Sequence, residues 1–497
     1  MESTGHYRGH IFVLESIWPF VRRKSAWAVG PILLVLGLCA GPAAADPLQV
    51  HRYHLTISED LKTLAVRAEL ASRMRTIRSR NSSTAEFVSG VKSCAGQPLK
   101  RAGRNIELPS SVSCVTYRFD LAGADASERR SWVRLAPSNL LIKPSDWLFR
   151  PRVSADSELE LTIDLPPGVI LSVPWPAGDS PGTYRLTASP ASSKALLALG
   201  TFEQREIAVP GALLRASFLR DDVGPMDVDK ISAWLKQAAS GVALAHGRFP
   251  NPNPQVLVVP VRGSRSSPVP FGRVIRDGGE AVQFFVDPDR SLDDLLGDWT
   301  ATHEFAHLLL PYVKDRWVSE GFASYYQNVL MGRSGYYTEL KGWIKLHAGI
   351  ERARAVRPLM SPVATSGRGR KPRMMVYWSG SALALLGDVR QRQLSGGEES
   401  LEVVLGRMAD CCLPSAETWD AERFFARLDE LSEHKVWMAL YRQHAKSPGI
   451  PDLTKLYQQL GIEVDADGGL TLDDNAPQAD LRRALMGPAP TAATVSR

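Results

Sequence analysis

The sequence predicts an α+β multidomain chain, in which an N-terminal antiparallel β-sandwich precedes a mixed domain and a C-terminal helical lobe. The chain has 497 residues, and because one domain usually takes roughly 100–200 residues, two or three folded units are expected. Apolar and polar residues alternate in short runs up to about residue 215, and apolar residues then recur with a helical period. With 44% hydrophobic and 23% charged residues, the composition excludes a mostly disordered or fibrous chain.

The first 45 residues have the features of a signal peptide. Arg22-Arg23-Lys24 forms a basic region, an apolar stretch runs from Ala26 to Leu38, and three alanines precede Asp46. We therefore expect an exported protein, periplasmic or secreted. An uncleaved segment would instead anchor the protein in a membrane, and this alternative stays open.

The net charge argues against a nucleic-acid partner. A formal charge of +6 on a chain of this size is too small for the dense basic stripe that nucleic-acid binding requires. We expect no nucleic acid among the partners.

Two of the five cysteines are predicted to form a disulfide. Cys94 and Cys114 flank a short, turn-rich stretch, and exported proteins can keep disulfides. Cys411 and Cys412 are adjacent; adjacent cysteines seldom bond to each other, and the sequence leaves the disulfide status of this pair open. No cysteine belongs to a CxxC pair, which argues against a cysteine zinc site.

Residues 46–215 are expected to form the β-sandwich-like domain. Leu159, Leu161 and Ile163 alternate with polar residues, and a Pro-Pro-Gly turn at 166–168 ends the run. Such runs between turns predict antiparallel strands.

Helix and strand signals mix in residues 216–335. Apolar residues from Ile231 to Val242 share one helical face, whereas Val256–Val259 and Phe284–Val286 have the pattern of buried strands. Residues 336–475 have helical signals almost throughout, and we expect them to form a lobe that closes a cleft. Residues 476–497 are rich in Ala, Pro and Thr and are expected to be a mobile tail.

The residues that carry chemistry are His303-Glu304-Phe305-Ala306-His307. A capping signal at Ser291 predicts the start of a helix and Pro311 its end, so both histidines lie one turn apart on one face and can bind one metal ion. Glu304 lies beside them, where its carboxylate can take a proton from water at the metal. With Glu320 as a third ligand, a zinc ion keeps one open position, as a catalytic site requires.

The segment HEFAH followed by WVSEGFASYY at 317–326 resembles the gluzincin metallopeptidases, and among them the glycyl aminopeptidase family (peptidase family M-sixty-one). The similarity continues through Val376–Leu383 and covers roughly Asp294 to Ile462. It implies a thermolysin-like catalytic domain at 216–335, which carries the HExxH helix, and a helical lobe at 336–475. Only 35 residues follow Ile462, so we expect no PDZ domain.

The resemblance also implies roles for particular residues. The metal ligands of one zinc ion per chain would be His303, His307 and Glu320. Glu304 would activate the water, and Tyr377 would donate a hydrogen bond to the oxyanion of the substrate.

Two further regions complete the predicted site. Ser324 lies one turn beyond Glu320 and is a candidate to hydrogen-bond a ligand or its neighbour. Phe271–Ile275 is a candidate edge strand that pairs with an extended peptide, with Gly272 and Arg273 contacting the substrate.

The sequence therefore predicts an exported zinc metallopeptidase that acts on peptides or proteins, with water activated by zinc and Glu304. A strict aminopeptidase is one alternative, although Phe271–Ile275 lacks the acidic residue that reads a free amino terminus in many aminopeptidases. The other alternative is a non-catalytic envelope protein that keeps the fold to bind peptides. It stays open because only twelve residues separate His307 from Glu320, and because Ser379 replaces a lysine of the family.

Overall fold

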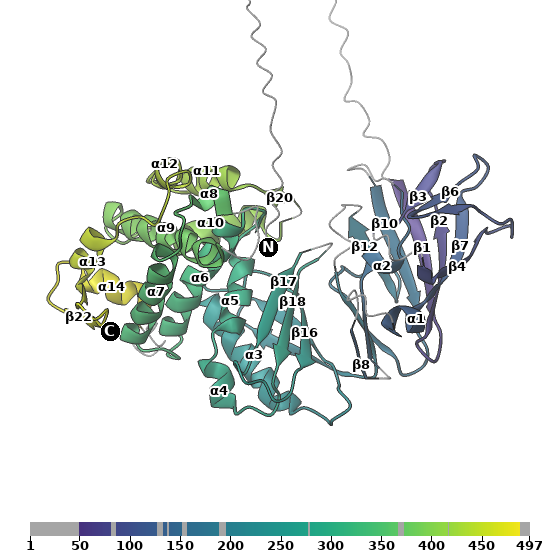
Figure 1. Cartoon of the computed structure of the whole chain (residues 1–497), viewed down its shortest axis with the longest axis horizontal. Coiled ribbons are helices and arrows are strands. Elements are labelled where there is room, and N and C mark those ends of the chain that lie inside the picture. The colour runs from purple at the N-terminus through teal and green to yellow at the C-terminus, as the bar shows by residue number, and fades with distance from the viewer. Residues whose placement is uncertain are drawn as a thin grey trace, which may run out of the picture. The chain divides into compact units, whose positions relative to one another are not determined.

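The computed structural model describes residues 49–80, 86–126, 133–136, 139–151, 157–187, 195–276, 279–365, 372–415 and 417–487 (Figure 1). The signal peptide expected at 1–45 lies outside these ranges. None of the helices within them has the length and hydropathy of a membrane span.

The N-terminal part is a β-sandwich, as predicted. A six-stranded sheet in the order β12-β10-β1-β2-β7-β4 and a four-stranded sheet in the order β11-β13-β9-β8 share one hydrophobic core. The alternation at Leu159, Leu161 and Ile163 places these side chains in that core. One pair of strands, β1 with β10, is parallel, so the six-stranded sheet is not antiparallel throughout as expected.

The strands of the two sheets have the following bounds: β1 Gln49–Ile57, β2 Thr63–Glu69, β4 Val88–Ser93, β7 Cys114–Asp120, β10 Ser157–Asp164, β12 Thr183–Thr187, β8 Val133–Ala136, β9 Asn139–Ile142, β11 Ile170–Ser172 and β13 Leu197–Gly200. A small third sheet contains β3 Thr76–Arg78, β6 Asn105–Glu107 and β5 Arg101–Ala102, and two short helices, α1 Leu121–Ala126 and α2 Pro144–Trp147, belong to the same region.

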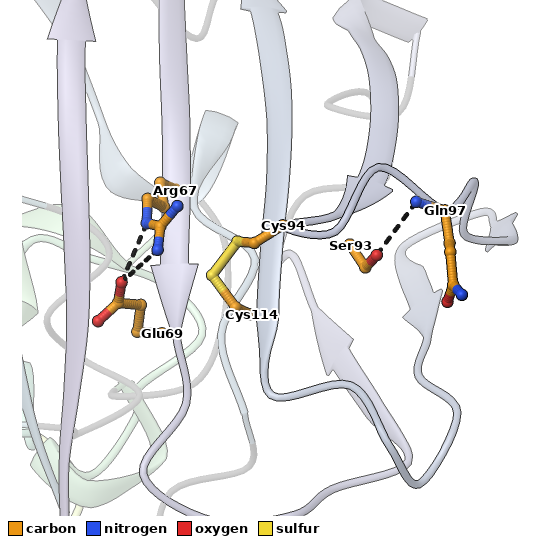
Figure 2. Close-up of a disulfide and its surroundings, with 6 residues drawn as sticks. All are labelled: Arg67, Glu69, Ser93, Cys94, Gln97 and Cys114. Carbon is orange, nitrogen blue, oxygen red and sulfur yellow. Dashed lines mark hydrogen bonds and ion pairs between the residues drawn. A yellow bond between two sulfur atoms is a disulfide. The ribbon is translucent and has the colours of Figure 1, made fainter.

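A disulfide joins Cys94 to Cys114 at the start of β7, as predicted (Figure 2). The two residues are 20 positions apart in the sequence, and a cross-link that closes a loop of this size stabilises a protein by about 3 kcal/mol. Replacing both cysteines with serine is therefore expected to lower the free energy of unfolding by about 2–4 kcal/mol, measured by denaturant titration. The matched control is the double serine variant at Cys411 and Cys412, and equal losses in the two variants would contradict this expectation.

Cys411 and Cys412, whose disulfide status the sequence left open, are bonded to each other. They end helix α10 (Leu401–Cys412), where the chain leaves helical geometry at Leu413. Because this bond joins neighbours in the sequence, it constrains the unfolded chain far less than the bond between Cys94 and Cys114.

The sheet that positions the candidate site has five strands in the order β14-β15-β16-β18-β17. It contains β14 Glu203–Val209, β15 Ala212–Phe218, β16 Gln255–Pro260, β17 Phe271–Ile275 and β18 Ala281–Val286. The predicted domain boundary at 215/216 is wrong, because β15 pairs with both β14 and β16 and so brings the 203–218 hairpin into this sheet. Among the strands that the structure describes, β17 pairs with β18 alone, which confirms the predicted edge strand.

The two faces of the five-stranded sheet have different neighbours. One face packs against helices α3 (Val228–Ala243) and α5 (Thr300–Ala306), which lie beside β16, β17 and β18 (Figure 1). On the other face, Leu257 and Val259 share a small core with Leu141 and Ala198 of the four-stranded sheet. The candidate site lies on the α5 side.

Two helices replace the single helix predicted from Ser291 to Leu310. Ser291 Oγ accepts the backbone N–H of Asp294 at 3.0 Å and caps α4 (Leu292–Gly297). The chain then leaves the helix at Asp298, whose carboxylate accepts the N–H of Thr300 at 2.8 Å. Such local side-chain bonds compete with continued helix, so α5 is a separate helix that begins at Thr300.

Helices dominate the rest of the chain. They are α6 Arg316–Arg333, α7 Glu339–Arg354, α8 Pro362–Thr365, α9 Arg373–Leu394, α10, α11 Ala421–Leu431, α12 Trp437–His444, α13 Thr454–Leu460 and α14 Ala479–Met486, with the short strand pairs β19 Tyr312–Val313 with β20 Thr418–Trp419, and β21 Ile462–Val464 with β22 Leu470–Leu472. This agrees with the predicted helical lobe.

Helices α6 and α9 cross at two glycines. A Cβ placed on Gly321 would lie 2.4 Å from the Cα of Gly380, and a Cβ on Gly380 would lie 1.9 Å from the carbonyl oxygen of Trp317. Only glycine permits backbones to approach this closely. The crossing holds Glu320 of α6 and Tyr377 of α9 near each other, because each lies within one turn of its glycine.

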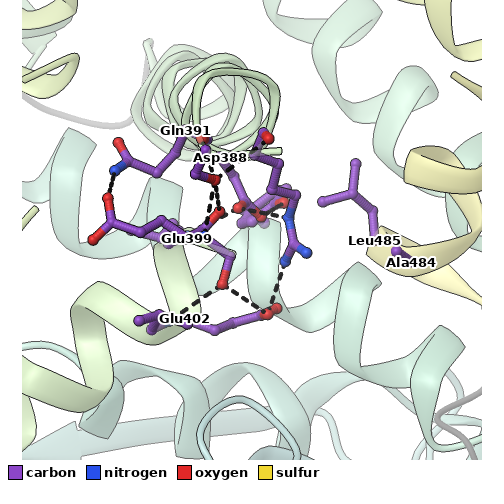
Figure 3. Close-up of polar contacts among 12 residues, drawn as sticks. Asp388, Gln391, Glu399, Glu402, Ala484 and Leu485 are labelled. Carbon is purple, nitrogen blue, oxygen red and sulfur yellow. Dashed lines mark hydrogen bonds and ion pairs between the residues drawn. The ribbon is translucent and has the colours of Figure 1, made fainter. Parts of the chain in front are cut away.

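A buried ionic network joins α6, α9 and α10 (Figure 3). The fully buried carboxylate of Asp388 accepts the hydroxyl of Tyr325 at 2.6 Å and Nε of Arg392 at 3.0 Å. Glu402 accepts Nη2 of Arg392 at 2.8 Å and pairs with Nη1 of Arg333 at 2.6 Å. Two carboxylates thus face two guanidinium groups, so that the opposite charges compensate each other where water cannot reach them.

Residues 476–487 are not a mobile tail, contrary to prediction. Helix α14 lies there, and its carbonyl oxygens at Ala484 and Leu485 accept hydrogen bonds from Arg333 at 2.9 and 3.0 Å. The side chain of Arg482 is fully buried and pairs with Glu339 at 2.8 Å. The composition of this segment did not predict the helix, because the contacts that bury it come from α6 and α7. The remainder of the predicted tail, 488–497, lies outside the described residues.

Candidate metal centre

Three side chains from neighbouring helical segments converge on one point. His303 of α5, His307 at the start of the 3-10 turn η3 (His307–Leu309) and Glu320 of α6 have ligand atoms within 4.8 Å of one another. Glu320 Oε2 lies 3.5 Å from His303 Nε2 and 3.6 Å from His307 Nε2. Ligand atoms bound to one tetrahedral zinc ion lie roughly 3.3 Å apart. The three predicted ligands therefore fit one zinc ion.

The twelve-residue connection from His307 to Glu320 is held by a distant part of the chain. β19 follows Pro311 and pairs in parallel with β20. Asp315, which precedes α6, accepts the backbone N–H of Ala421 at 2.8 Å. Because the first helix ends before Pro311, the chain turns back within a few residues, and the short connection still brings Glu320 to the histidines.

The second nitrogen of each imidazole contacts α6. Gln327 Oε1 lies 3.1 Å from Nδ1 of His303, and Ser319 Oγ lies 3.4 Å from Nδ1 of His307. These contacts orient the rings so that both Nε2 atoms face Glu320, and such outer partners tune metal affinity. We expected this role for Ser324, but the contacts are made by Gln327 and Ser319. The position of Gln327, two helical turns after Glu320, is the feature of the sequence that could have indicated it.

Burial and charge act differently on the two carboxylates of the site. Burial raises the pKa of Glu320, but hydrogen bonds from His303 and His307 outweigh burial and hold that pKa well below its usual range. The Glu320 side chain is therefore anionic, as its predicted role as a ligand requires. Burial raises the pKa of Glu304, and the two histidines offset only part of this rise, so this carboxylate has an increased affinity for a proton.

Gly272 of the edge strand β17 lies directly against Glu304. A Cβ placed on Gly272 would lie 2.6 Å from Glu304 Cγ and 3.0 Å from Thr300 Cγ2. A glycine at this position thus lets the strand approach α5. Arg273 points to the opposite face of the sheet, since side chains alternate along a strand, and its Nε donates to Gln283 Oε1 at 2.6 Å. Of the two predicted substrate contacts, only Gly272 lies against Glu304.

Replacing Gly272 with alanine is expected to displace the Glu304 side chain and lower kcat/KM roughly 100-fold, because displacements of about 1 Å in a catalytic group have effects of this size. Zinc affinity should change little, since the three atoms nearest the new methyl group belong to Glu304 and Thr300 and not to a predicted ligand. The matched control is Gly297→Ala, whose Cβ would meet nothing within 4 Å. Equal kcat/KM values for the two variants would show that the approach of β17 to Glu304 has no role in activity.

Tyr377 lies beside His303, at the start of the second turn of α9. Its ring centroid is 6.0 Å from that of His303. Burial first, and the negative charge of Glu320 second, raise the pKa of the Tyr377 hydroxyl. This hydroxyl is protonated at neutral pH and is available as a hydrogen-bond donor, as the role implied for it requires.

Comparison with known proteins gives a likeness in structure but none in sequence. No protein-family model matches the chain, and no curated protein is similar to it in sequence. An aminopeptidase N family protein from Idiomarina loihiensis shares 16% identity over 86% of this chain and 82% of its own, with a TM-score of 0.63. A glutamate-to-alanine variant of an M1 zinc metallopeptidase from Deinococcus radiodurans, bound to a Tyr-Ser-Ala substrate, shares 14% identity over 82% of this chain and 95% of its own, with a TM-score of 0.50.

These structures bear on the fold, which is similar to that of an aminopeptidase N family protein and of an M1 zinc metallopeptidase, and they do not extend the likeness to the glycyl aminopeptidase family. The likeness in fold covers 86% and 82% of this chain, respectively. The chain therefore has the multidomain fold of the M1 zinc metallopeptidases.

Proposed function

We propose that this protein is a zinc-dependent peptidase that binds one zinc ion per chain and hydrolyses peptide bonds. The observation that carries the proposal is the convergence of His303, His307 and Glu320 on a site that fits zinc, with Glu304 between the ligands and the edge strand β17. The fold supports it, since a metallopeptidase with this fold has been solved with a tripeptide substrate.

The zinc ion, Glu304 and Tyr377 have different roles in the proposed reaction. When bound, zinc supplies Lewis acidity, which polarises a carbonyl group and lowers the pKa of water. Glu304 accepts a proton from the attacking water and passes it to the leaving amine, and its raised proton affinity suits both steps. Tyr377 donates its hydroxyl hydrogen bond to the oxyanion that forms on the substrate.

The free edge of β17 orients the substrate. An extended peptide adds to this edge as a further strand, held by backbone hydrogen bonds, and Gly272 places that strand beside Glu304. β17 has the sequence Phe-Gly-Arg-Val-Ile and contains no carboxylate, so nothing in it selects a free amino group. We therefore infer that peptides with blocked amino termini are also cleaved.

The basic and apolar segment before Asp46 and the disulfide between Cys94 and Cys114 support action outside the cytoplasm. On this proposal the protein is periplasmic or secreted.

Replacing Tyr377 with phenylalanine is expected to lower kcat roughly 100- to 1,000-fold, the effect of removing one oxyanion donor. KM should change little, because the hydrogen bond from the hydroxyl to the oxyanion of the transition state is stronger than its hydrogen bond to the carbonyl oxygen of the bound substrate. Steady-state kinetics on one fluorogenic peptide separate the two constants. The control is Tyr441→Phe, a tyrosine in α12; a Tyr377→Phe variant as active as this control would remove Tyr377 from the mechanism.

The proposed function is tested by titrating metal-free protein with zinc while peptide hydrolysis is followed. Activity should rise linearly and stop rising at one zinc ion per chain. N-acetylated and free peptides of the same sequence should be cut at similar rates, whereas cleavage of the free peptide alone would establish a strict aminopeptidase. A protein that binds peptides but cleaves none when zinc is bound would be the non-catalytic alternative.

A further inference from the structure

A buried arginine at the end of the edge strand holds the end of the helical segment that carries the histidines. Arg276 directly follows β17, and its side chain is only 7% exposed. Its Nη1 donates to the carbonyl oxygen of Leu310 at 2.7 Å, and its Nη2 donates to the carbonyl oxygen of His307. One guanidinium therefore binds the backbone of a predicted ligand and the backbone just before Pro311.

The two carbonyl groups lie where the helical segment ends. η3 ends at Leu309, and the last carbonyl groups of a helical segment lack the N–H donors of a following turn. The carbonyl oxygen of His307 accepts the N–H of Leu310 at 3.3 Å, and its second lone pair is available for Arg276. A cation at this end also interacts favourably with the helix dipole. The planar fork of arginine supplies two parallel donors, which the single ammonium of lysine does not.

The charge of Arg276 is balanced within the same hairpin. Glu280, also 7% exposed, lies 3.7 Å from Nε of Arg276. The second carboxylate oxygen of Glu280 accepts a hydrogen bond from Nδ2 of Asn251 at 2.5 Å, which holds the carboxylate in place on the side away from Arg276. A buried pair held on both sides keeps one geometry, whereas an unpaired buried guanidinium would be strongly destabilising.

We propose that Arg276 is a positioning residue of the metal centre, which fixes the backbone of His307 and the start of the short connection to Glu320 against the end of β17. This inference rests on the proposed function. The inference follows from the two segments that the guanidinium connects. One is β17, which carries Gly272 against Glu304, and the other contains the proposed metal ligand His307. Arg276 thereby sets the distance between the strand that binds substrate and the helix that holds zinc.

The test compares Arg276→Gln with the wild-type full-length chain. Zinc affinity, measured by competition with a chelator, is expected to be about 10–100-fold weaker, as for other outer partners of metal ligands. The visible spectrum of the Co²⁺-substituted protein should change, because the ligand geometry changes. At saturating zinc, kcat should fall more than KM rises. Arg276→Lys keeps the charge without the fork, and its zinc affinity should lie between those of the other two proteins.

Arg482→Gln is the matched control. Arg482 is also buried and donates to a backbone carbonyl oxygen, that of Asp473 at 2.8 Å, but it lies in α14, outside the metal centre. This variant should lose stability and keep the wild-type zinc affinity and Co²⁺ spectrum.

Two results would overturn the inference. One is an Arg276→Gln protein with wild-type zinc affinity and Co²⁺ spectrum. The other is an equal loss of zinc by the Arg276 and Arg482 variants once the unfolded fraction is subtracted, which would mean that only stability matters. If Arg276→Gln does not fold, the same measurements are made on Arg276→Lys. Wild-type zinc affinity and a wild-type Co²⁺ spectrum in that variant would overturn the inference. Failure of the wild-type chain itself to bind zinc would instead refute the proposed function, and with it the role of Arg276.

Discussion

Replacing Glu304 with glutamine should leave zinc affinity unchanged and lower kcat roughly 100- to 10,000-fold, the contribution of a positioned general base. The amide keeps the size of the side chain and its place beside Gly272, but it cannot accept a proton. Zinc binding should survive because the three ligands that fit the ion are His303, His307 and Glu320.

Two measurements on the Glu304 variant are needed together. Chelator competition gives the zinc affinity, and hydrolysis of one fluorogenic peptide at saturating zinc gives kcat. Glu398→Gln, which changes an exposed glutamate, provides the control for loss of one negative charge. A Glu304→Gln protein with the kcat of the control would refute the proposed role of this carboxylate.

Replacing Asp388 with asparagine should lower the free energy of unfolding by about 3–5 kcal/mol, the cost of breaking a buried ion pair by removing one partner. The Asp388 carboxylate has no exposed surface and binds Arg392 and the hydroxyl of Tyr325. Without its charge, Glu402 alone faces the two guanidinium groups of Arg392 and Arg333. Because this network joins α6 to α9 and α10, its loss weakens the packing around the metal centre.

Denaturant titration at fixed zinc concentration measures this effect. The matched control is Asp410→Asn, which removes a carboxylate that pairs with Arg248 in an exposed position, where ion pairs contribute little. Equal unfolding midpoints for the two variants would show that the buried network does not stabilise the fold.

Features that depend on local sequence were predictable. The alternation at Leu159, Leu161 and Ile163 predicted a half-buried strand, since strand geometry alone sends alternate side chains to one face. The spacing of His303 and His307 predicted neighbouring imidazoles, since residues four apart lie on one face of a helix. Pro311 marked the end of the helical segment because proline cannot continue a helix.

Features that depend on contacts between distant segments were not predictable. β14 and β15 have the local pattern of the preceding strands, and only the pairing of β15 with β16 places them in the five-stranded sheet. Ser324 and Gln327 both lie at helical spacing from Glu320, and only the position of α5 decides that Gln327 contacts His303. Arg276 gave no signal, because its partners at His307 and Leu310 are backbone atoms more than thirty residues away.

The central claim, zinc-dependent peptide hydrolysis with Glu304 as the base, is tested most directly by mass spectrometry of a mixed peptide library. Zinc-loaded wild-type protein, the same protein with the metal removed, and zinc-loaded Glu304→Gln would be incubated with the library in parallel. We predict new peptide fragments, including fragments of amino-terminally blocked peptides, with the zinc-loaded wild type alone. No fragments from the zinc-loaded wild type, or the same fragments from all three samples, would contradict the account.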